Sequence, residues 1–328
     1  MFADQIRDSQ NAPAPDSAPL RLLTITHDAR VQRALDVLWR DHDVIACADP
    51  LAAAALAASR DVDAVLCDQR VGQAFGVDLL REIRQLHPRA LRMLLSDRPE
   101  PRLLLDAINE AEVFRLVFQP WNIAAMRDAA SAALRAARLA PPLGVAAPSD
   151  EEIEHVRKTM AVVVIESDAA VQQRLRDLLH GHYKTHFAVS LDRALQFMEQ
   201  HETGVLVCST ASGRGDLITA LKALKQAHPH LATVVIDALD DADRAAELVN
   251  EAQVFRLMRR PFNPALCRPY VDAALARYWQ IKQQPQSAWR VFPAESLVAE
   301  RAPQRLPPAL LNRIRGLPGR LHEAEGVR

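Results

Sequence analysis

The sequence predicts an α/β protein with two tandem flavodoxin-like (βα)5 domains, each a three-layer sandwich around a parallel five-stranded sheet. Two observations lead to this prediction. The sequence repeats itself over the length of a domain, and each copy alternates short apolar segments with stretches of helical periodicity. A chain of 328 residues is also long enough for two domains of ordinary size.

The repeat is clearest near the end of each copy. Residues 107–122 (AINEAEVFRLVFQPWN) and 248–263 (LVNEAQVFRLMRRPFN) are identical at nine of sixteen positions, at an offset of 141 residues. Near the start of each copy, ITHDARVQRAL from Ile25 matches IESDAAVQQRL from Ile165 at an offset of 140. These matches indicate duplication of a whole domain, with a single-residue insertion or deletion between the copies.

The apolar segments are rich in Val, Ile and Leu and too short for helices, which is typical of parallel strands covered on both faces. In the first copy we expect strands at Leu22–Thr26, Val44–Cys47, Ala64–Cys67, Arg92–Ser96 and Arg115–Phe118. In the second copy we expect them at Ala161–Glu166, Thr185–Val189, Val205–Cys208, Thr233–Asp237 and Phe255–Met258. Helical stretches lie between them, including Ala29–Arg40, Gly76–Leu86, Pro101–Glu110 and Asn122–Leu139.

The predicted organisation is a flexible lead (1–19), domain 1 (20–140), a linker (141–159), domain 2 (160–283) and a tail containing Pro and Arg (284–328). Ser149 and Glu152 have the spacing of a helix capping box, so a short helix is expected at 150–158. The tail is either solvated or a docking segment for a partner, and Pro308–Arg315 is its helical candidate.

Composition argues against several classes of protein. The chain has 40 Lys and Arg against 41 Asp and Glu, which gives no overall attraction to nucleic acid or membranes, so neither partner is expected. No apolar run approaches the roughly 18 residues of a membrane span, and the N-terminus lacks the apolar segment of a signal peptide. The cysteines have no metal-type spacing, and they suggest a cytoplasmic protein with reduced thiols. They are Cys47, Cys67, Cys208 and Cys267.

The first copy resembles the receiver domains of two-component response regulators. VLCDQRVGQAFGVDLLREIRQLHP, which begins at Val65, resembles a receiver's third strand, phospho-acceptor loop and third helix. AINEAEVFRLVFQPWN resembles the receiver ending A-I-N-x-G-x-[IV]-x-R-F-x-x-K-P-W. The second copy is assigned to the same family through the repeat. The resemblance implies an aspartate that accepts a phosphoryl group, acidic residues that hold Mg²⁺, and a lysine and a hydroxyl that contact the phosphoryl oxygens.

In domain 1 the resemblance assigns Asp68 to the phospho-acceptor position and Ser96 to the hydroxyl position. Thr26 and His27 replace the acidic pair, and Asp28 follows one place late. Gln119 stands at the lysine position and Leu116 at the aromatic switch position. Three alternatives stay open for Asp68. It is phosphorylated, with Mg²⁺ held by Asp28 and Asp68, or it is a relic of the ancestral site. In the third alternative, His27, Asp28 and Asp68 bind a transition metal. No cofactor is strictly required.

Domain 2 departs further from the family pattern. Ser209 stands at the acceptor position, where a hydroxyl cannot form an acyl phosphate. The other receiver-site positions hold Glu166, Ser167, Asp168, Asp237, Leu257 and Arg260. We expect Glu166, Asp168, Asp237 and Arg260 to form a salt-bridge cluster that locks one conformation without phosphate.

The resemblance therefore predicts a non-enzymatic, receiver-only adaptor that acts largely independently of phosphorylation. Its expected docking surface in domain 1 combines Pro101–Glu110, Val113–Phe118 and Asn122–Leu139, the fourth helix, fifth strand and fifth helix of a receiver. Expected partners are a histidine kinase, another regulator, an output protein or a second copy of the chain through this face. In the alternative function, Asp68 is a working switch or a phosphate sink for a kinase. Transcriptional control through the basic tail is a third candidate, although no DNA-binding fold is recognisable.

Overall fold

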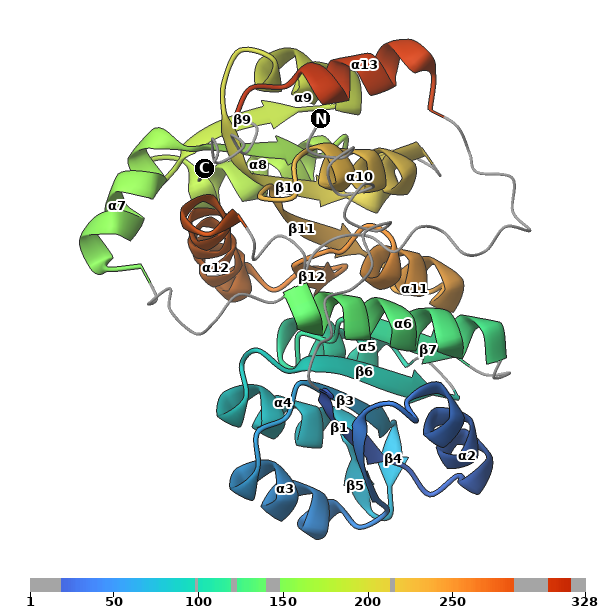
Figure 1. Cartoon of the computed structure of the whole chain (residues 1–328). Helices are drawn as coiled ribbons and strands as arrows, with labels where there is room; N and C mark the ends of the chain where they lie inside the picture. Colours follow the sequence, from blue (N-terminus) through green and yellow to red (C-terminus); the bar gives the residue numbers. More distant parts are fainter. Residues whose placement is uncertain are drawn as a thin grey trace, which may run out of the picture.

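The computed structural model describes residues 19–97, 100–118, 123–139, 148–212, 216–285 and 306–319. The described chain forms two domains, each with a parallel five-stranded sheet between helical layers (Figure 1). This architecture confirms the predicted fold class. Ten predicted strands are present with ends that shift by one or two residues, and the capping box of Ser149 and Glu152 starts a helix as expected.

Domain 1 contains the first sheet and five helices. The strands are β1 (Arg21–Ile25), β2 (Asp43–Cys47), β3 (Ala64–Asp68), β6 (Leu91–Ser96) and β7 (Arg115–Phe118), in the spatial order β2-β1-β3-β6-β7. The helices are α2 (Ala29–Leu38), α3 (Pro50–Ser59), α4 (Gly76–Leu86), α5 (Pro101–Asn109) and α6 (Ile123–Leu139). A small hairpin of β4 (Arg70–Val71) and β5 (Ala74–Phe75), which the sequence did not predict, follows β3.

Domain 2 repeats this plan after the leading helix α7 (Asp150–Thr159). Its strands are β8 (Ala161–Ile165), β9 (Lys184–Ala188), β10 (Thr203–Ser209), β11 (Ala232–Asp237) and β12 (Arg256–Arg259), in the order β12-β11-β10-β8-β9. Its helices are α8 (Ala169–Leu179), α9 (Leu191–Met198), the short 3-10 turn η1 (Thr210–Ser212), α10 (Asp216–Ala227), α11 (Ala242–Asn250) and α12 (Pro264–Gln283).

Alternate residues of each strand face opposite helical layers, as the pleat of a strand requires. In β1, Leu22 packs in the cluster that contains α2 and α6, while Leu23 packs in the cluster that contains α3, α4 and α5. In β8, Val162 and Val163 divide in the same way between the two layers of domain 2. Both faces of each sheet are therefore buried, which explains the continuous apolar strands.

The two domains pack through equivalent faces. Asn109 at the end of α5 donates its amide to the carbonyl of Leu257 (2.8 Å) and accepts the N–H of Leu257 (2.9 Å). Asn250 at the end of α11 does the same with the carbonyl (2.8 Å) and N–H (2.9 Å) of Leu116. Because β7 and β12 are edge strands, these backbone groups point away from their own sheets and need an outside partner. We call these four residues the interdomain clamp.

The expected docking surface is therefore not free over α5 and β7, and that expectation is wrong for these two elements. Leu104 of α5 and Leu116 of β7 are buried in one hydrophobic cluster with Leu248 and Leu257 of domain 2. Figure 1 shows α5 and β7 at the seam with α11 and β12. Sequence reasoning could not show that domain 2 covers this face, because the contact joins two separate domains.

The tail contributes helix α13 (Pro308–Gly316), which lies against α9 and α10 of domain 2 (Figure 1). Leu306, Ile314 and Leu317 are buried there. Arg313 forms ion pairs with Asp192 (3.0 Å) and Glu199 (2.6 Å). Neither alternative for the tail describes residues 306–319, which are docked on the chain's own second domain.

Candidate functional site

The receiver-type site of domain 1 lies at the carboxyl end of β3, where Asp68 ends the strand. The hydroxyl of Thr26 and the backbone N–H of His27 (3.3 Å) both donate to Oδ2 of Asp68. Burial raises the pKa of Asp68, while these two hydrogen bonds act in the opposite direction. In the described part of the chain no group donates a hydrogen bond to Oδ1, so that oxygen is the available nucleophilic atom of the carboxylate.

Asp28 caps helix α2 through one oxygen of its carboxylate. Its Oδ1 accepts the backbone N–H groups of Arg30 (2.7 Å) and Val31 (3.4 Å), which is the geometry of a helix N-cap. Thr26 is buried and bonded to Asp68, and His27 contributes imidazole, a poor ligand for Mg²⁺. Among the described residues no group of three or more His, Cys, Asp or Glu could hold a metal ion. These side chains do not fit the magnesium site that the family pattern implies.

The remaining receiver positions of domain 1 do not converge on Asp68. The hydroxyl of Ser96 donates to Oε1 of Gln69 (2.5 Å), the residue after the acceptor position. Leu116, at the aromatic switch position, is buried and its backbone is held by Asn250. Gln119 lies outside the described residues. The structure therefore brings Thr26, His27 and Asp68 together and directs Ser96 and Asp28 to other partners.

In the corresponding site of domain 2, side chains at the receiver-site positions contact one another directly. Nη2 of Arg260 donates to Oγ of Ser209 (2.6 Å) and to Oε2 of Glu166, with which it forms an ion pair. The Glu166 side chain is fully buried and that of Arg260 is one-quarter exposed, at 0% and 25%. Oε1 of Glu166 also accepts the N–H of Asp168 (2.9 Å). The arginine thus joins the acceptor position to an acidic position with no phosphoryl group between them.

The predicted four-residue salt-bridge cluster is only partly correct. Glu166 and Arg260 pair as expected, but Asp168 caps α8 through the N–H groups of Ala170 and Val171, as Asp28 caps α2. Asp237 pairs with Arg244 (3.3 Å), a residue that sequence reasoning did not single out. Ser167 is exposed, and Leu257 lies in the interdomain clamp.

The two sites share one side-chain hydrogen bond, but the donor position of one domain is the acceptor position of the other. In domain 1 the hydroxyl of Ser96 donates to the side-chain amide oxygen of Gln69. In domain 2 the hydroxyl belongs to Thr210 and donates to the carboxylate of Asp237, at positions 141 residues further along. Comparison of the repeats reveals this exchange, because Gln69 and Ser96 change together to Thr210 and Asp237. The bond connects the third and fourth strands in order of sequence in both domains.

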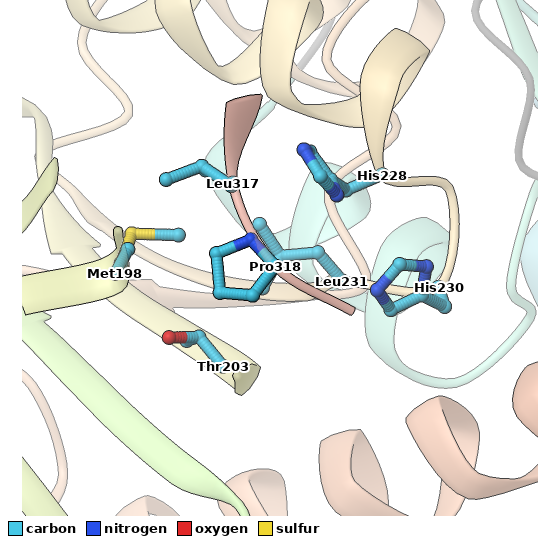
Figure 2. Close-up of a pocket in the computed structure, with 7 residues that line it drawn as sticks. All are labelled: Met198, Thr203, His228, His230, Leu231, Leu317 and Pro318. Carbon is cyan, nitrogen blue, oxygen red and sulfur yellow. The ribbon is translucent and has the colours of Figure 1, made fainter. Parts of the chain in front are cut away.

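A small crevice lies elsewhere, between domain 2 and the tail. Its walls are Met198, Thr203, His228, His230, Leu231, Leu317 and Pro318. Figure 2 shows Leu317 and Pro318 between Met198 and the two histidines. Nε2 of His228 contacts the carbonyl of Ile314 (2.8 Å), and burial lowers the pKa of His230 to about 2. These contacts anchor the tail, and the crevice has no nucleophile paired with a base.

Within the part of the chain that the structure describes, no helix is both long and apolar enough to cross a membrane. No known family model matches the chain.

Known proteins that resemble the chain are regulators and receiver domains. The hydrogenase transcriptional regulatory protein HoxA of Bradyrhizobium diazoefficiens is 32% identical over 102 residues, which are 31% of this chain and 21% of the relative. HoxA of Cupriavidus necator is 29% identical over 101 residues, 30% of this chain and 21% of the relative. The chain thus spans about a fifth of the length of these relatives.

The chain is also similar to a solved structure of a receiver domain. The signal receiver domain of an HD domain-containing protein from Pseudomonas fluorescens Pf-5 is 28% identical, with a TM-score of 0.35. The match covers 37% of this chain and 98% of that structure. The chain is thus similar to these regulators over about a third of its length, and the ordered motifs of domain 1 resemble those of response-regulator receiver domains.

Proposed function

We propose that the chain is a receiver-only adaptor in two-component signalling, acting in the cytoplasm through protein–protein contacts and largely without phosphorylation. The observation that supports this most directly is the side-chain linkage of Ser209, Arg260 and Glu166 in domain 2. A receiver switches when a phosphoryl group attracts the surrounding cation and hydroxyl. In domain 2 a buried carboxylate already engages the cation, so the site has one stable arrangement.

Domain 1 supports the same proposal because Thr26, His27 and Asp28 do not supply the pair of acidic residues that the family uses to hold Mg²⁺. Phosphoryl transfer depends on cations that neutralise the charge on the equatorial oxygens. Asp28 is engaged as a helix cap, and Thr26 offers a hydroxyl where the family has a carboxylate. We therefore expect phosphorylation of Asp68 to be slow compared with that of an ordinary receiver.

The proposed partners are a histidine kinase, another regulator or an output protein. Since α5 and β7 are covered, the surface left to such a partner in domain 1 lies elsewhere. Large exposed apolar side chains of domain 1 include Val37 on α2, Leu51 on α3 and Leu86 on α4, at 71%, 79% and 51% exposure. Reduced thiols fit the proposed compartment, because all four cysteines are free in the structure.

One observation favours the alternative, in which domain 1 is a working phosphoryl acceptor. Asp68 is only partly buried, and its Oδ1 accepts no hydrogen bond within the described residues. This geometry leaves one carboxylate oxygen available for attack on a phosphoryl donor. The chain would then serve as a switch or a phosphate sink for a kinase.

Intact-mass analysis of the full chain after incubation with acetyl phosphate, with Mg²⁺ and again with Mn²⁺, tests the proposal. We expect no phosphate adduct under either metal. Asp68→Ala is the control for adducts at other residues. A labile adduct on the wild type that is missing from Asp68→Ala would replace the adaptor with the switch or sink.

A further inference from the structure

Basic side chains from both domains gather at the interdomain seam, at the amino ends of the strands. Arg92 is the second residue of β6 and Arg256 is the first residue of β12. Asp68 and Ser209, by contrast, are the last residues of their strands, so the receiver-type sites lie at the opposite ends of the strands. Five residues make up this basic group, which we call the seam cluster: Arg84, Arg92, Lys225, Arg256 and Arg277.

Among the described residues, one carboxylate contacts the seam cluster. Glu112, which precedes β7, forms ion pairs with Arg84 of its own domain (2.9 Å) and with Arg256 of domain 2 (2.9 Å). Arg277 on α12 lies close enough to act on Glu112 electrostatically. It also acts on Lys225 of the same domain, with which it shares a positive charge. Five basic groups therefore share a single acidic partner, which two of them already occupy.

Arg277 is the member of the cluster that lacks a direct partner in the described part of the chain. Its Nε is buried and donates no hydrogen bond to any described residue. The residue as a whole is only half-buried, so an anion can approach it from solvent. Burial lowers the pKa of Arg277, and Arg256 acts in the same direction. A buried donor without an acceptor is unfavourable, so this guanidinium has unused capacity to bind an anion.

Arg92 is buried, and carbonyl groups rather than a carboxylate accept its hydrogen bonds. Its Nε donates to the carbonyl of Ala111 (2.6 Å) and its Nη1 to that of Ala90 (2.6 Å). Burial lowers the pKa of Arg92 to about 10, and Arg84 and Arg277 act in the same direction. Carbonyl groups satisfy the donors but do not cancel the charge. An anion nearby would therefore lower the electrostatic free energy of the cluster.

Comparison of the repeats shows that the seam can pack without these charges. At an offset of 141 residues, the counterpart of Arg92 is Thr233 and that of Arg277 is Ala136. The two halves of the interdomain clamp nevertheless make the same hydrogen bonds. Packing of the domains therefore does not explain why one side of the seam carries the additional arginines.

From these contacts we infer that the seam cluster binds a phosphate group, with Arg277 as its main ligand. A guanidinium presents paired N–H donors that match two phosphate oxygens, and it stays charged at neutral pH. Arg84 is the accessible cation on the domain 1 side, with 34% of its side chain exposed. Phosphate bound between the two would join the domains and stabilise their arrangement by mass action. The inference does not rest on phosphorylation of Asp68, so it fails or succeeds independently of the proposed function.

Isothermal titration calorimetry of the full chain with inorganic phosphate, at constant ionic strength in a chloride buffer, tests the inference. The wild type should bind phosphate. Arg277→Met removes the guanidinium and should weaken binding by at least about tenfold. Arg268→Met is the matched control on the same helix, because Arg268 is exposed and donates to the carbonyl of Leu178 (2.7 Å). This control should bind phosphate as the wild type does.

Glu112→Gln separates an anion site from a merely structural role of the cluster. It removes the carboxylate that contacts the cluster but keeps a side-chain oxygen for Arg84 and Arg256. Phosphate should then bind roughly threefold more tightly, because one repulsive negative charge is gone. A purely structural contribution of the arginines to the seam would give no such gain.

Adenosine monophosphate, as a second probe, distinguishes two sources of the phosphate group. Tighter binding than that of inorganic phosphate would indicate a nucleotide, and weaker binding would indicate free phosphate. Circular dichroism checks that each variant is folded. If Arg277→Met does not fold, Arg277→Lys replaces it and should also weaken binding, because it keeps the charge but loses the paired donors. Absence of binding to the wild type, equal binding by the Arg277 variant, or weaker binding by Glu112→Gln would overturn the inference.

Discussion

At the scale of single residues, the buried pair of Glu166 and Arg260 determines the state of the domain 2 site. The Glu166 side chain has no exposed surface, and Arg260 is the cation that it contacts. We expect Arg260→Ala to lower the free energy of unfolding by about 3 kcal/mol, since it removes the ion-pair partner of a buried carboxylate. Urea unfolding measures this change. In a Glu166→Leu background the same substitution should cost much less, and equal costs in both backgrounds would contradict the role of the pair.

Lys225 supplies a pH dependence at the same scale. Burial lowers its pKa from 10.5 to about 7, and its ammonium group donates to the carbonyl of Leu231 (2.7 Å). Between these pKa values the unfolded chain binds a proton that the folded chain does not. The free energy of unfolding should therefore rise with pH in this window, by up to about 1.4 kcal/mol per unit.

Comparison of the wild type with Lys225→Met by urea unfolding at pH 7 and pH 9 measures this contribution. The wild type should gain stability relative to Lys225→Met as the pH rises. Lys222→Met removes a lysine from the same helix and should keep the wild-type dependence. Parallel curves for the wild type and Lys225→Met would exclude the contribution of Lys225.

At the scale of secondary-structure elements, the interdomain clamp supplies hydrogen-bond partners to backbone groups of the two edge strands β7 and β12. Asn109→Ala should lower the free energy of unfolding by about 1–3 kcal/mol, because it leaves the N–H and carbonyl of Leu257 without partners. Asn250→Ala should cost less, since the hydrogen bonds to Leu116 are only part-buried. Thermal unfolding compares both with Asn312→Ala, an exposed position on α13. A cost no larger than that of Asn312→Ala would argue against the clamp.

Helix α13 makes in domain 2 a pair of contacts that α3 makes in domain 1. In domain 1, α3 packs on α4, and Nε2 of His87 contacts the carbonyl of Ala57 (2.6 Å). In domain 2, the counterpart His228 instead contacts the carbonyl of Ile314 in α13, which packs on α10. The tail helix therefore takes over contacts that the second helix of the repeat makes in domain 1.

At the scale of the whole molecule, one hydrophobic cluster extends from domain 1 through the interdomain face into domain 2 and the tail. We expect the wild type to unfold in a single calorimetric transition, because breaking either domain exposes the shared face. Glu112 of domain 1 pairs with Arg256 of domain 2 (2.9 Å). Glu112→Arg would set two arginines together between the domains and should separate the unfolding into two transitions. Two resolved transitions in the wild type would show that the domains unfold independently.

The sequence by itself determined the fold class, the repeat and the positions of the receiver-type residues. Strand periodicity and helix caps are local properties, so Ser149 and most element boundaries could be predicted from short segments. The residue types at positions 68 and 209 also indicated that the two sites differ. Aligning the repeats shows that Gln69 and Ser96 of domain 1 correspond to Thr210 and Asp237 of domain 2. Only the structure shows that each pair forms a hydrogen bond between its two members.

The tertiary structure alone decided which partners these residues take. A carboxylate such as Asp28 can cap a helix or bind a metal, and the choice depends on where its side chain points. Asp237, at the end of β11, likewise pairs with Arg244 of the following helix α11 rather than with Arg260. The interdomain clamp joins Asn109 to Leu257, 148 residues away, and Asn250 to Leu116, 134 residues away. Contacts of this range depend on how two completed domains meet, which no local pattern in the chain specifies.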